Sequence, residues 1–577
     1  MSEGSDRRRF LVAGAAAFAS IEMLGGPRAA AAPLGQETSV DDGADPGDAP
    51  GIPPGVVEAA ERLAGIEFTP EERRTIAETI GEQLEIFAAR QARGPLPNEL
   101  APATVFRALL PGQRPQWATT EGRVRDFVPE EPGPLPADDA AIAFAPVVRL
   151  AGWIRRRSIT SRRLTELCLR RLERFDPKLR CVITMCPDRA RDAADRADAE
   201  LAAGRWRGPL HGIPWGAKDI IDTAGIATTW GAETHRDRIA ERNAVVVDRL
   251  DRAGAVLVAK LSVGALAYGD IWFGGRTNNP FEVEQGSSGS SAGSCSAVAA
   301  GLVPFALGTE TLGSIVSPCV RCGTTGLRPT FGRVARTGCM ALVWSMDKIG
   351  PIARTVADTA LVLDAINGAD DGDPSSVIEP LRIDPAADAR GLQVGYDPSW
   401  FEGRNARLRP VLAALRSAGA ELVELRLPEV ATEPLLLPLY AEAAAAFEDL
   451  VRSDRDDELA WQAPEAWPNT FRRSWFLPAI ELVQADRLRR EAMERTARLF
   501  ESVDAIVSPP FAGGILLLTN ATGHPTLVQR AGFTKEGSPY GVTFTGRLFD
   551  EGTLVRLGAA VEKALGVSTR RPAGFDA

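Results

Sequence analysis

Residues 286–314 read GSSGSSAGSCSAVAAGLVPFALGTETLGS. Glycine and serine crowd the first part of this stretch, and the apolar part behind it predicts a helix over 294–301 and a buried strand or turn over 302–307. A flexible linker would not run into buried structure, because buried backbone must be hydrogen-bonded. Small residues there let a substrate approach the main chain and leave N–H groups free to bind an oxyanion.

Helical and strand patterns alternate outward from this stretch. Residues 244–252 have helical spacing, Gly254 ends that helix, and 255–259 form a short β-rich run. Alternation of this kind predicts an α/β fold with a buried sheet. Further strand candidates downstream are 392–395, 421–425 and 503–507.

Several longer motifs follow one another along the chain. GIPWGAKD covers 212–219, SGSSAGS covers 288–294 and GTETLGSI covers 308–315. Three shorter blocks follow them: GLRPT at 326–330, SMDKIGP at 345–351 and TGHP at 522–525. In this order the motifs resemble those of the amidase signature enzymes. The resemblance covers roughly residues 145–565.

This resemblance implies the amidase signature fold, an α/β architecture in which helices cover both faces of a central mixed β-sheet. It also implies a Ser-Ser-Lys triad. Carried over to this sequence, Ser314 is the nucleophile, Ser290 is the proton relay and Lys218 is the base.

The choice of Ser290 among six neighbouring serines rests on an ungapped alignment. It runs back from Ser314 through the Ala-Ala-Gly at 299–301. The family joins the relay serine to the preceding residue, here Gly289, by a cis peptide bond. Gly289 and Ser291 are therefore interpreted as supporting residues.

The residue types agree with this chemistry. Serine is a weak nucleophile without a base, and lysine can be that base only when neutral. Burial can lower the lysine pKa from about 10.4 by several units, and the apolar, small residues 213–217 predict a buried stem for Lys218. The expected reaction hydrolyses a carboxylic amide to an acid and ammonia or an amine, through an acyl-enzyme on Ser314.

The resemblance also implies an oxyanion hole, made by the backbone N–H groups of Thr311, Leu312, Gly313 and Ser314. Here the sequence departs from the common pattern. Leu312 stands where the family usually has glycine, and Val316 stands where it often has arginine. Because leucine disfavours a positive φ, we expect a changed loop geometry and a narrower pocket.

Composition excludes some classes of partner. The chain has 577 residues and a net charge of −10, with no basic blocks interleaved with aromatic residues, which argues against nucleic acid. Cys319 and Cys322 form a C-x-x-C, but zinc would need a second pair of ligands. None of the three histidines lies at a matching spacing, so we expect neither a metal nor an organic cofactor.

The N-terminus has the parts of an export signal. Arg7–Arg9 precede an apolar run from Phe10 to about Leu24, and small residues follow up to Pro33. The paired arginines before Phe-Leu resemble a twin-arginine signal, and the apolar run is shorter than the roughly 20 residues of a membrane span. We expect an exported protein, periplasmic or extracellular, with no stable membrane span after removal of the signal.

The predicted organisation has four parts. Residues 1–32 are the signal, 33–55 a flexible linker rich in Gly, Pro, Asp and Ala, 56–140 a helical extension with a Pro-rich connector, and 141–577 the catalytic domain. In the extension, Thr69-Pro70-Glu71-Glu72 predicts a capping box at the start of a helix.

Three other interpretations compete with the amidase. Gly289 to Gly293 fits the G-x-S-x-G of an α/β-hydrolase, with Ser291 as nucleophile and His524 as partner. The chain could also serve as one component of an amidotransferase, supplying ammonia to a partner that acts on charged tRNA. A non-catalytic exported binding protein with the same fold is the third. The resemblance implies a small-molecule or peptide amide as substrate and leaves the oligomeric state open.

Overall fold

The structure, a computed structural model, describes residues 52–576 with gaps at 93, 119–123 and 386. The expected export signal over 1–32 and nearly all of the linker over 33–55 lie outside the described residues. In the part that is described, none of the helices has the length and apolar character needed to cross a bilayer.

The chain divides into two compact units. The first contains the residues up to Pro97 together with Arg473–Glu481, and the second contains Asn98–Arg472 and Leu482–Ala577. The second unit holds the sheet and every residue of the predicted site.

The first unit begins with three short helices. They are α2 (Pro54–Ala64), α3 (Pro70–Thr79) and α4 (Gly81–Ala92). The predicted capping box is present at the start of α3, where the Glu72 N–H donates to Thr69 Oγ1 and the Thr69 N–H donates to Glu72 Oε2. Arg73 then donates two hydrogen bonds of 2.8 Å to Glu61 and ties α3 to α2.

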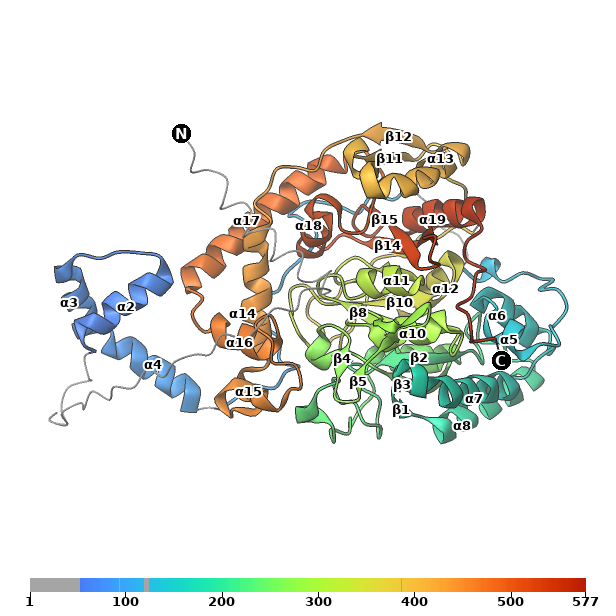
Figure 1. Ribbon diagram of the computed structural model, residues 1–577, viewed down its shortest axis with the longest axis horizontal. Coiled ribbons are helices and arrows are strands. Elements are labelled where there is room, and N and C mark those ends of the chain that lie inside the picture. Colours follow the sequence, from blue (N-terminus) through green and yellow to red (C-terminus); the bar gives the residue numbers. More distant parts are fainter. Residues whose placement is uncertain (1–51, 93, 119–123, 386, 577) are drawn as a thin grey trace. The chain divides into compact units, whose positions relative to one another are not determined.

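A mixed sheet of eleven strands runs through the described part of the second unit (Figure 1). In spatial order the strands are β1 (Val182–Met185), β3 (Val256–Leu261), β2 (Pro214–Lys218), β8 (Phe305–Glu310), β10 (Lys348–Ala353), β9 (Thr325–Arg328), β14 (Thr526–Phe533), β15 (Pro539–Gly546), β13 (Ala505–Ser508), β11 (Gln393–Tyr396) and β12 (Glu421–Glu424). β2 is parallel to β3 and β8, β11 is parallel to β12 and β13, and the other pairs are antiparallel.

Helices and two short ribbons surround this sheet. The helices are α5 (Asp139–Ala143), α6 (Val147–Arg155), α7 (Ser161–Leu179), α8 (Pro187–Ala202), α9 (Val245–Ala253), α10 (Ala292–Ala299), α11 (Val316–Cys322), α12 (Val356–Ile366), α13 (Arg409–Ser417), α14 (Leu437–Ala446), α15 (Glu448–Arg452), α16 (Trp467–Ser474), α17 (Ala479–Leu499), α18 (Ile515–Ala521) and α19 (Glu551–Leu565). The ribbons pair β4 (Ile271–Trp272) with β5 (Gly275–Arg276) and β6 (Asn278–Asn279) with β7 (Glu282–Gly286).

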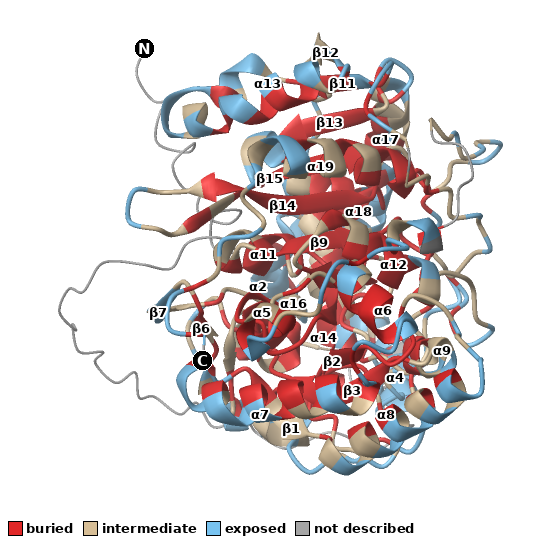
Figure 2. Cartoon of the chain, turned by 90° about the vertical axis from the view of Figure 1, so that its right-hand side faces the viewer, coloured by how far each residue is buried: buried red, intermediate tan, exposed pale blue. Residues whose placement is uncertain are grey.

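Neighbouring residues of β14 show that helices cover both faces of the sheet. Leu527 packs closely on Gly558 of α19. The next residue, Val528, lies in the buried cluster that contains Ile315 and Cys319 beside α11. Because successive side chains of a strand point to opposite faces, α11 and α19 lie on opposite sides. Figure 2 shows the central strands in the red of buried residues. The predicted α/β fold with a covered mixed sheet is confirmed.

The first part of the 286–314 stretch folds nearly as predicted, but the strand after it lies three residues further along the chain. The predicted helix is α10, and the strand begins at Phe305 and continues through Gly308 to Glu310, where a loop was expected. Pairing with β2 and β10 on either side satisfies this backbone. Sheet pairing therefore outweighs the weak β propensity of glycine.

The Pro-rich connector packs on the second unit from Asn98 onward. The Asn98 side-chain amide exchanges hydrogen bonds with the backbone of Ala341, at 2.9 and 2.8 Å. Further along, Phe106 stacks edge-on against Phe331, and Trp117 Nε1 donates to the Phe549 carbonyl at 3.0 Å. These contacts anchor a segment that has little regular structure.

A buried ion pair fastens the end of β8 to the end of β9. Arg328 donates to Glu310 Oε1 at 2.6 Å, and both side chains are fully buried. Glu310 Oε2 accepts the N–H groups of Ile315 and Val316, each at 2.9 Å. Burial opposes ionisation of Glu310, but Arg328 and these N–H groups outweigh it and lower the pKa of Glu310 to about 2.

We predict that Arg328→Met strongly destabilises the protein. It leaves the Glu310 carboxylate buried without its cation, which costs about 3–5 kcal/mol of the free energy of unfolding. The measurement is urea unfolding at pH 7. Arg490→Met is the matched control, because Arg490 pairs with Glu494 at 2.8 Å on an exposed helix surface and its loss costs at most about 1 kcal/mol. Equal effects of the two substitutions would contradict the prediction.

Candidate active site

Lys218 is the last residue of β2, between β3 and β8, and its side chain is fully buried. The small residues before it let the strand lie in the sheet interior. Its Nζ lies 2.8 Å from Ser290 Oγ, 2.7 Å from Thr309 Oγ1 and 3.2 Å from Ser291 Oγ. The structure thus brings the predicted base together with the predicted relay serine.

Burial changes the proton affinity of Lys218. Removing the ammonium from water lowers the pKa of Lys218 to about 7, and the negative charges of Asp347 and Glu310 oppose this effect. A large part of the Lys218 population is therefore neutral at physiological pH, and its amine has a lone pair available to accept a proton.

The peptide bond between Gly289 and Ser290 is cis, as the resemblance implies. Glycine is required before Ser290, because a Cβ on Gly289 would lie 1.8 Å from the Gly269 carbonyl oxygen. Ser291 is the N-cap residue of α10, and its Oγ donates to the Thr309 carbonyl while accepting the Thr309 N–H, both at 3.1 Å. Ser291 thus ties the segment that contains Ser290 to β8.

Ser314 lies in the short loop between β8 and α11 and is half-buried. Its carbonyl accepts the Ser291 N–H at 3.1 Å, which ties this loop to the Ser290 segment. Lys218 and Ser290 are hydrogen-bonded to each other. Within the described residues the Ser314 hydroxyl makes no hydrogen bond, so its side chain is bonded to neither of them.

The backbone N–H groups of Thr311, Leu312, Gly313 and Ser314 donate no hydrogen bond to any described residue outside the sheet ladder. The first three of these residues are buried. Unpaired N–H groups are rare in buried backbone. N–H groups without such partners, next to the half-buried Ser314, are available to bind an anion, as the expected oxyanion hole requires.

The two departures from the family pattern have separate explanations. Leu312 keeps a negative φ, and the left-handed position of the loop falls on Gly313 with φ 83°. The expected conflict at Leu312 therefore does not arise. Val316 is fully buried in the core cluster, and its N–H is bound by Glu310, so this position packs on apolar neighbours.

Thr309 and Glu310 belong to the site, although the sequence motifs alone assigned them no role. Thr309 Oγ1 is the nearest hydrogen-bond partner of Lys218 Nζ, and Glu310 fixes the start of α11. Their motif was recognisable, but only the hydrogen bond from Lys218 Nζ shows that Thr309 faces the lysine. Asp347, in the SMDKIGP block, accepts the N–H groups of Leu342 and Val343.

The residues of the rival interpretations are not brought together among the described residues. Ser291 is bonded to Lys218 and Thr309, whereas His524 is bonded to Thr522 at 2.8 Å. Burial and the neighbouring Arg328 lower the pKa of His524 to about 3. Cys319 and Cys322 are buried in the core, and the described residues contain no group of metal-ligating side chains.

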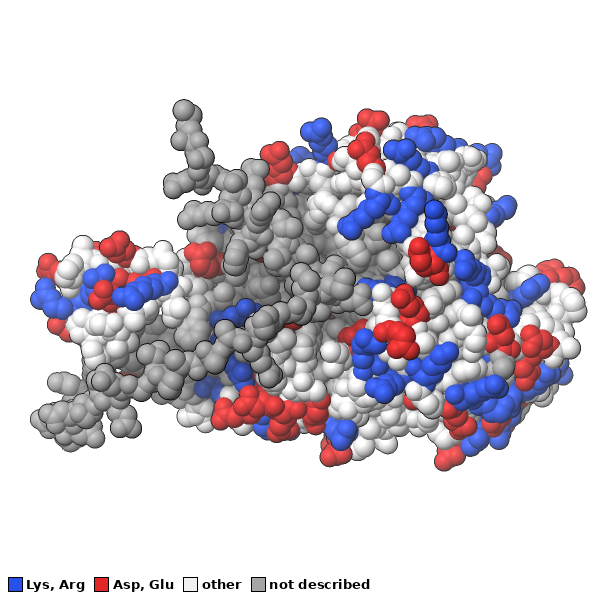
Figure 3. Space-filling model, viewed as in Figure 1, with Lys and Arg blue, Asp and Glu red and all other residues white. Residues whose placement is uncertain are grey.

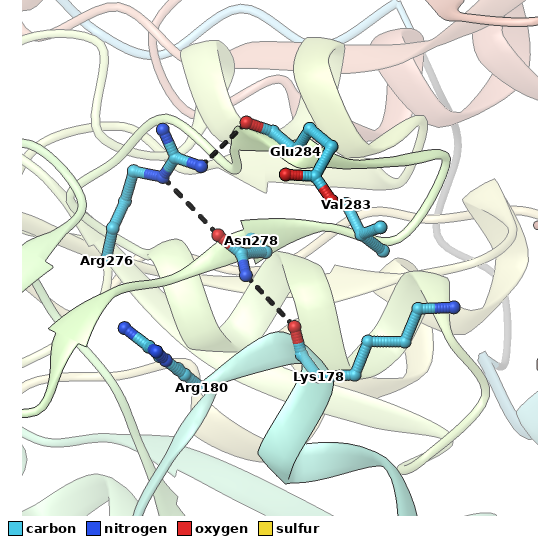
Figure 4. Close-up of a pocket in the computed structure, with 6 residues that line it drawn as sticks. All are labelled: Lys178, Arg180, Arg276, Asn278, Val283 and Glu284. Carbon is cyan, nitrogen blue, oxygen red and sulfur yellow. Dashed lines mark hydrogen bonds between the residues drawn. The ribbon is translucent and has the colours of Figure 1, made fainter.

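A cavity of about 510 Å³ lies away from these residues (Figure 4). It is lined by Lys178, Arg180, Arg276, Asn278, Val283 and Glu284. Asn278 donates to the Lys178 carbonyl at 3.0 Å, and Arg276 donates to the Glu284 carbonyl at 2.7 Å. None of the predicted triad lines this cavity. On the face drawn in Figure 3, basic and acidic side chains are interspersed over the described surface.

Known proteins resemble this chain over most of its length. The A subunit of the glutamyl-tRNA(Gln) amidotransferase of Chloroflexus aggregans is 36% identical over 464 residues, which are 72% of this chain and 95% of that protein. The solved peptide amidase from Stenotrophomonas maltophilia is 30% identical with a TM-score of 0.65, covering 75% of this chain and 99% of that one.

A solved amidase family protein from Bacillus anthracis is 26% identical with a TM-score of 0.67, covering 78% and 99% of the two chains. The family model described as Amidase matches residues 163–555, which include every residue of the predicted triad. Together with the geometry around Lys218, these matches show that the chain belongs to the amidase (amidase signature) family.

Proposed function

We propose that this protein is a serine amidase with a Ser-Ser-Lys triad made of Ser314, Ser290 and Lys218. One observation carries the proposal: a fully buried lysine, whose pKa is lowered to about 7, lies 2.8 Å from a serine hydroxyl. A buried lysine with only a structural role gains nothing from a lowered pKa, whereas a base must be neutral to act.

Acylation follows from this arrangement. Neutral Lys218 takes the hydroxyl proton of Ser290, and Ser290 takes that of Ser314. Ser314 Oγ then attacks the amide carbonyl carbon, and the C=O electrons move to the oxygen. The N–H groups of residues 311–314 stabilise the negative oxygen.

Collapse of this intermediate breaks the C–N bond. The relay returns its proton to the leaving nitrogen, which departs as ammonia or an amine. Water then attacks the acyl-enzyme with the same base, and the acid leaves as Ser314 regains its proton. The side chains of this chain relay the protons, its backbone N–H groups stabilise the negative oxygen and water supplies the hydroxyl group of the acid, so the proposal needs no cofactor.

We propose a small-molecule or peptide amide as the substrate, supported by the 30% identity to a peptide amidase. A second candidate is a component of an amidotransferase, which the 36% identity to the Chloroflexus aggregans protein favours. Export would distinguish the amidase from the amidotransferase component, because an exported chain does not meet charged tRNA. We propose export through the N-terminal twin-arginine pattern.

We predict that a fluorophosphonate probe labels Ser314 and that Lys218→Ala slows labelling by about 10²–10⁴-fold. The measurement is peptide mapping by mass spectrometry. Lys178→Ala, at an exposed position, is the matched control and should label normally. Label on Ser291 would support an α/β-hydrolase mechanism instead. A folded wild-type protein without label would favour a non-catalytic binding protein.

The rate of labelling should depend on pH through Lys218. Because the neutral amine is the base and its pKa is about 7, the rate should rise with pH through about 7 and level off above it. Below that pKa it should fall about tenfold per pH unit. The measurement is the second-order labelling rate between pH 5 and 9. A rate that still rises about tenfold per pH unit up to pH 9, as the ordinary lysine pKa of about 10.4 requires, would rule out Lys218 as a buried base.

Cell fractionation tests the proposed export. We expect the full-length protein outside the cytoplasm and the Arg8→Lys, Arg9→Lys double variant inside it, since the paired arginines are the recognised feature. The control is an unchanged labelling rate at Ser314 in both proteins. Wild-type protein retained in the cytoplasm would contradict export and strengthen the amidotransferase candidate.

A further inference from the structure

Asp347 makes a hydrogen bond to the first residue of the oxyanion loop. Thr311 Oγ1 donates to Asp347 Oδ1 at 2.5 Å. The register of the sheet explains the contact: Lys348 on β10 is opposite Glu310 on β8, so the preceding residue, Asp347, lies opposite Thr311. The hydrogen bond between Thr311 and Asp347 thus continues the pairing of β8 with β10 one position beyond the last paired residues.

The carboxylate of Asp347 is itself fixed in place. Its Oδ2 accepts the N–H groups of Leu342 and Val343 at 2.8 and 2.9 Å. Its backbone N–H donates to the Val343 carbonyl at 3.0 Å. A carboxylate that accepts two backbone N–H groups, on a residue whose own N–H is also bonded, can hold the Thr311 side chain in one position.

The hydrogen bonds of Asp347 and of the base involve residues close together in the chain. Thr309 Oγ1 accepts a hydrogen bond from Lys218 Nζ, and Thr311 Oγ1, two residues further on, donates to Asp347. The negative charge of Asp347 therefore lies near enough to act on Lys218.

We propose that Asp347 is a positioning residue of the amidase site: it holds Thr311, and with it the oxyanion loop, and its charge favours the protonated form of Lys218. The proposal rests on the proposed function. In this proposal the Asp347 side chain determines both the geometry of the oxyanion loop and the pH range in which Lys218 can act as the base.

Several charged groups lie near Lys218 and Asp347. Burial is the largest influence on the pKa of Lys218 and lowers it, and Asp347 is the strongest of the groups that raise it. The Cys295 thiol, Glu310 and the Cys339 thiol follow in that order, and the charge of Glu310 is paired with Arg328. Arg336 Nη1 donates to the Asp347 carbonyl at 3.3 Å, and the Arg336 guanidinium is itself paired with Asp373.

Two substitutions separate the two roles. Asp347→Asn removes the charge, and its amide can still bind Thr311 and the Leu342 and Val343 N–H groups. Thr311→Val removes the hydroxyl and keeps the charge. Thr311→Ser is the conservative variant, and Asp188→Asn, on a side chain that is 96% exposed, is the matched charge control. The readout is the second-order rate of fluorophosphonate labelling of Ser314 as a function of pH.

For Asp347→Asn we expect the inflection near pH 7 to move down by about 1 unit. At pH 6 this variant should then label at a larger fraction of its plateau rate than the wild type does. A merely structural role would lower the rate at every pH without moving the inflection. Asp347→Ser serves as a second charge-free variant should the asparagine fail to fold.

For Thr311→Val we expect an unchanged inflection and a plateau rate lowered by about tenfold, less than the roughly 10²–10³-fold cost of losing an oxyanion donor itself. Thr311→Ser should restore the rate, and Asp188→Asn should change neither quantity. An unmoved inflection in the charge-free variants, or an undiminished plateau in Thr311→Val, would overturn the inference. Absence of any label on wild-type Ser314 would instead refute the proposed function.

Discussion

The buried ion pair between Glu310 and Arg328 is the contact on which the site depends. Removing both charges from water costs several kcal/mol per ion, and their mutual attraction offsets this only when the remaining hydrogen-bonding atoms are also paired. Here Glu310 accepts two backbone N–H groups at the start of α11, and Arg328 donates to the His524 carbonyl and to Thr526. The pair therefore joins β8, β9, α11 and β14 around the loop that holds Ser314.

Lys218 shows the opposite solution for a buried charge. Its hydrogen-bond partners are the hydroxyls of Ser290, Ser291 and Thr309 and the Thr309 carbonyl. These groups do not compensate a full positive charge, so burial favours the neutral amine. The same interior thus keeps the Glu310 carboxylate charged and favours the neutral amine of Lys218. Glu310 fixes the start of the helix after the loop, and the neutral amine of Lys218 can accept a proton.

Local signals predicted several of the fold elements. The capping box at Thr69 and the left-handed Gly254 are local in sequence, because each involves residues a few positions apart. Pairing between distant strands is not local, and it converted the expected loop at 308–310 into strand. The lysine and both serines were found through motifs. A motif identifies residues by their positions in the sequence, but it does not show which side chains they contact in the folded protein.

The amino-acid sequence by itself determined the fold class and the family and singled out Lys218, Ser290 and Ser314 as the candidate triad, because these depend on periodicity and on motifs in a fixed order. Only the tertiary structure decided that Thr309 faces the lysine and that the left-handed position of the loop falls on the residue after Leu312. These properties arise from contacts between strands far apart in the chain. Hydrogen-bond geometry and burial exist only after the sheet has formed, and sequence spacing does not contain them.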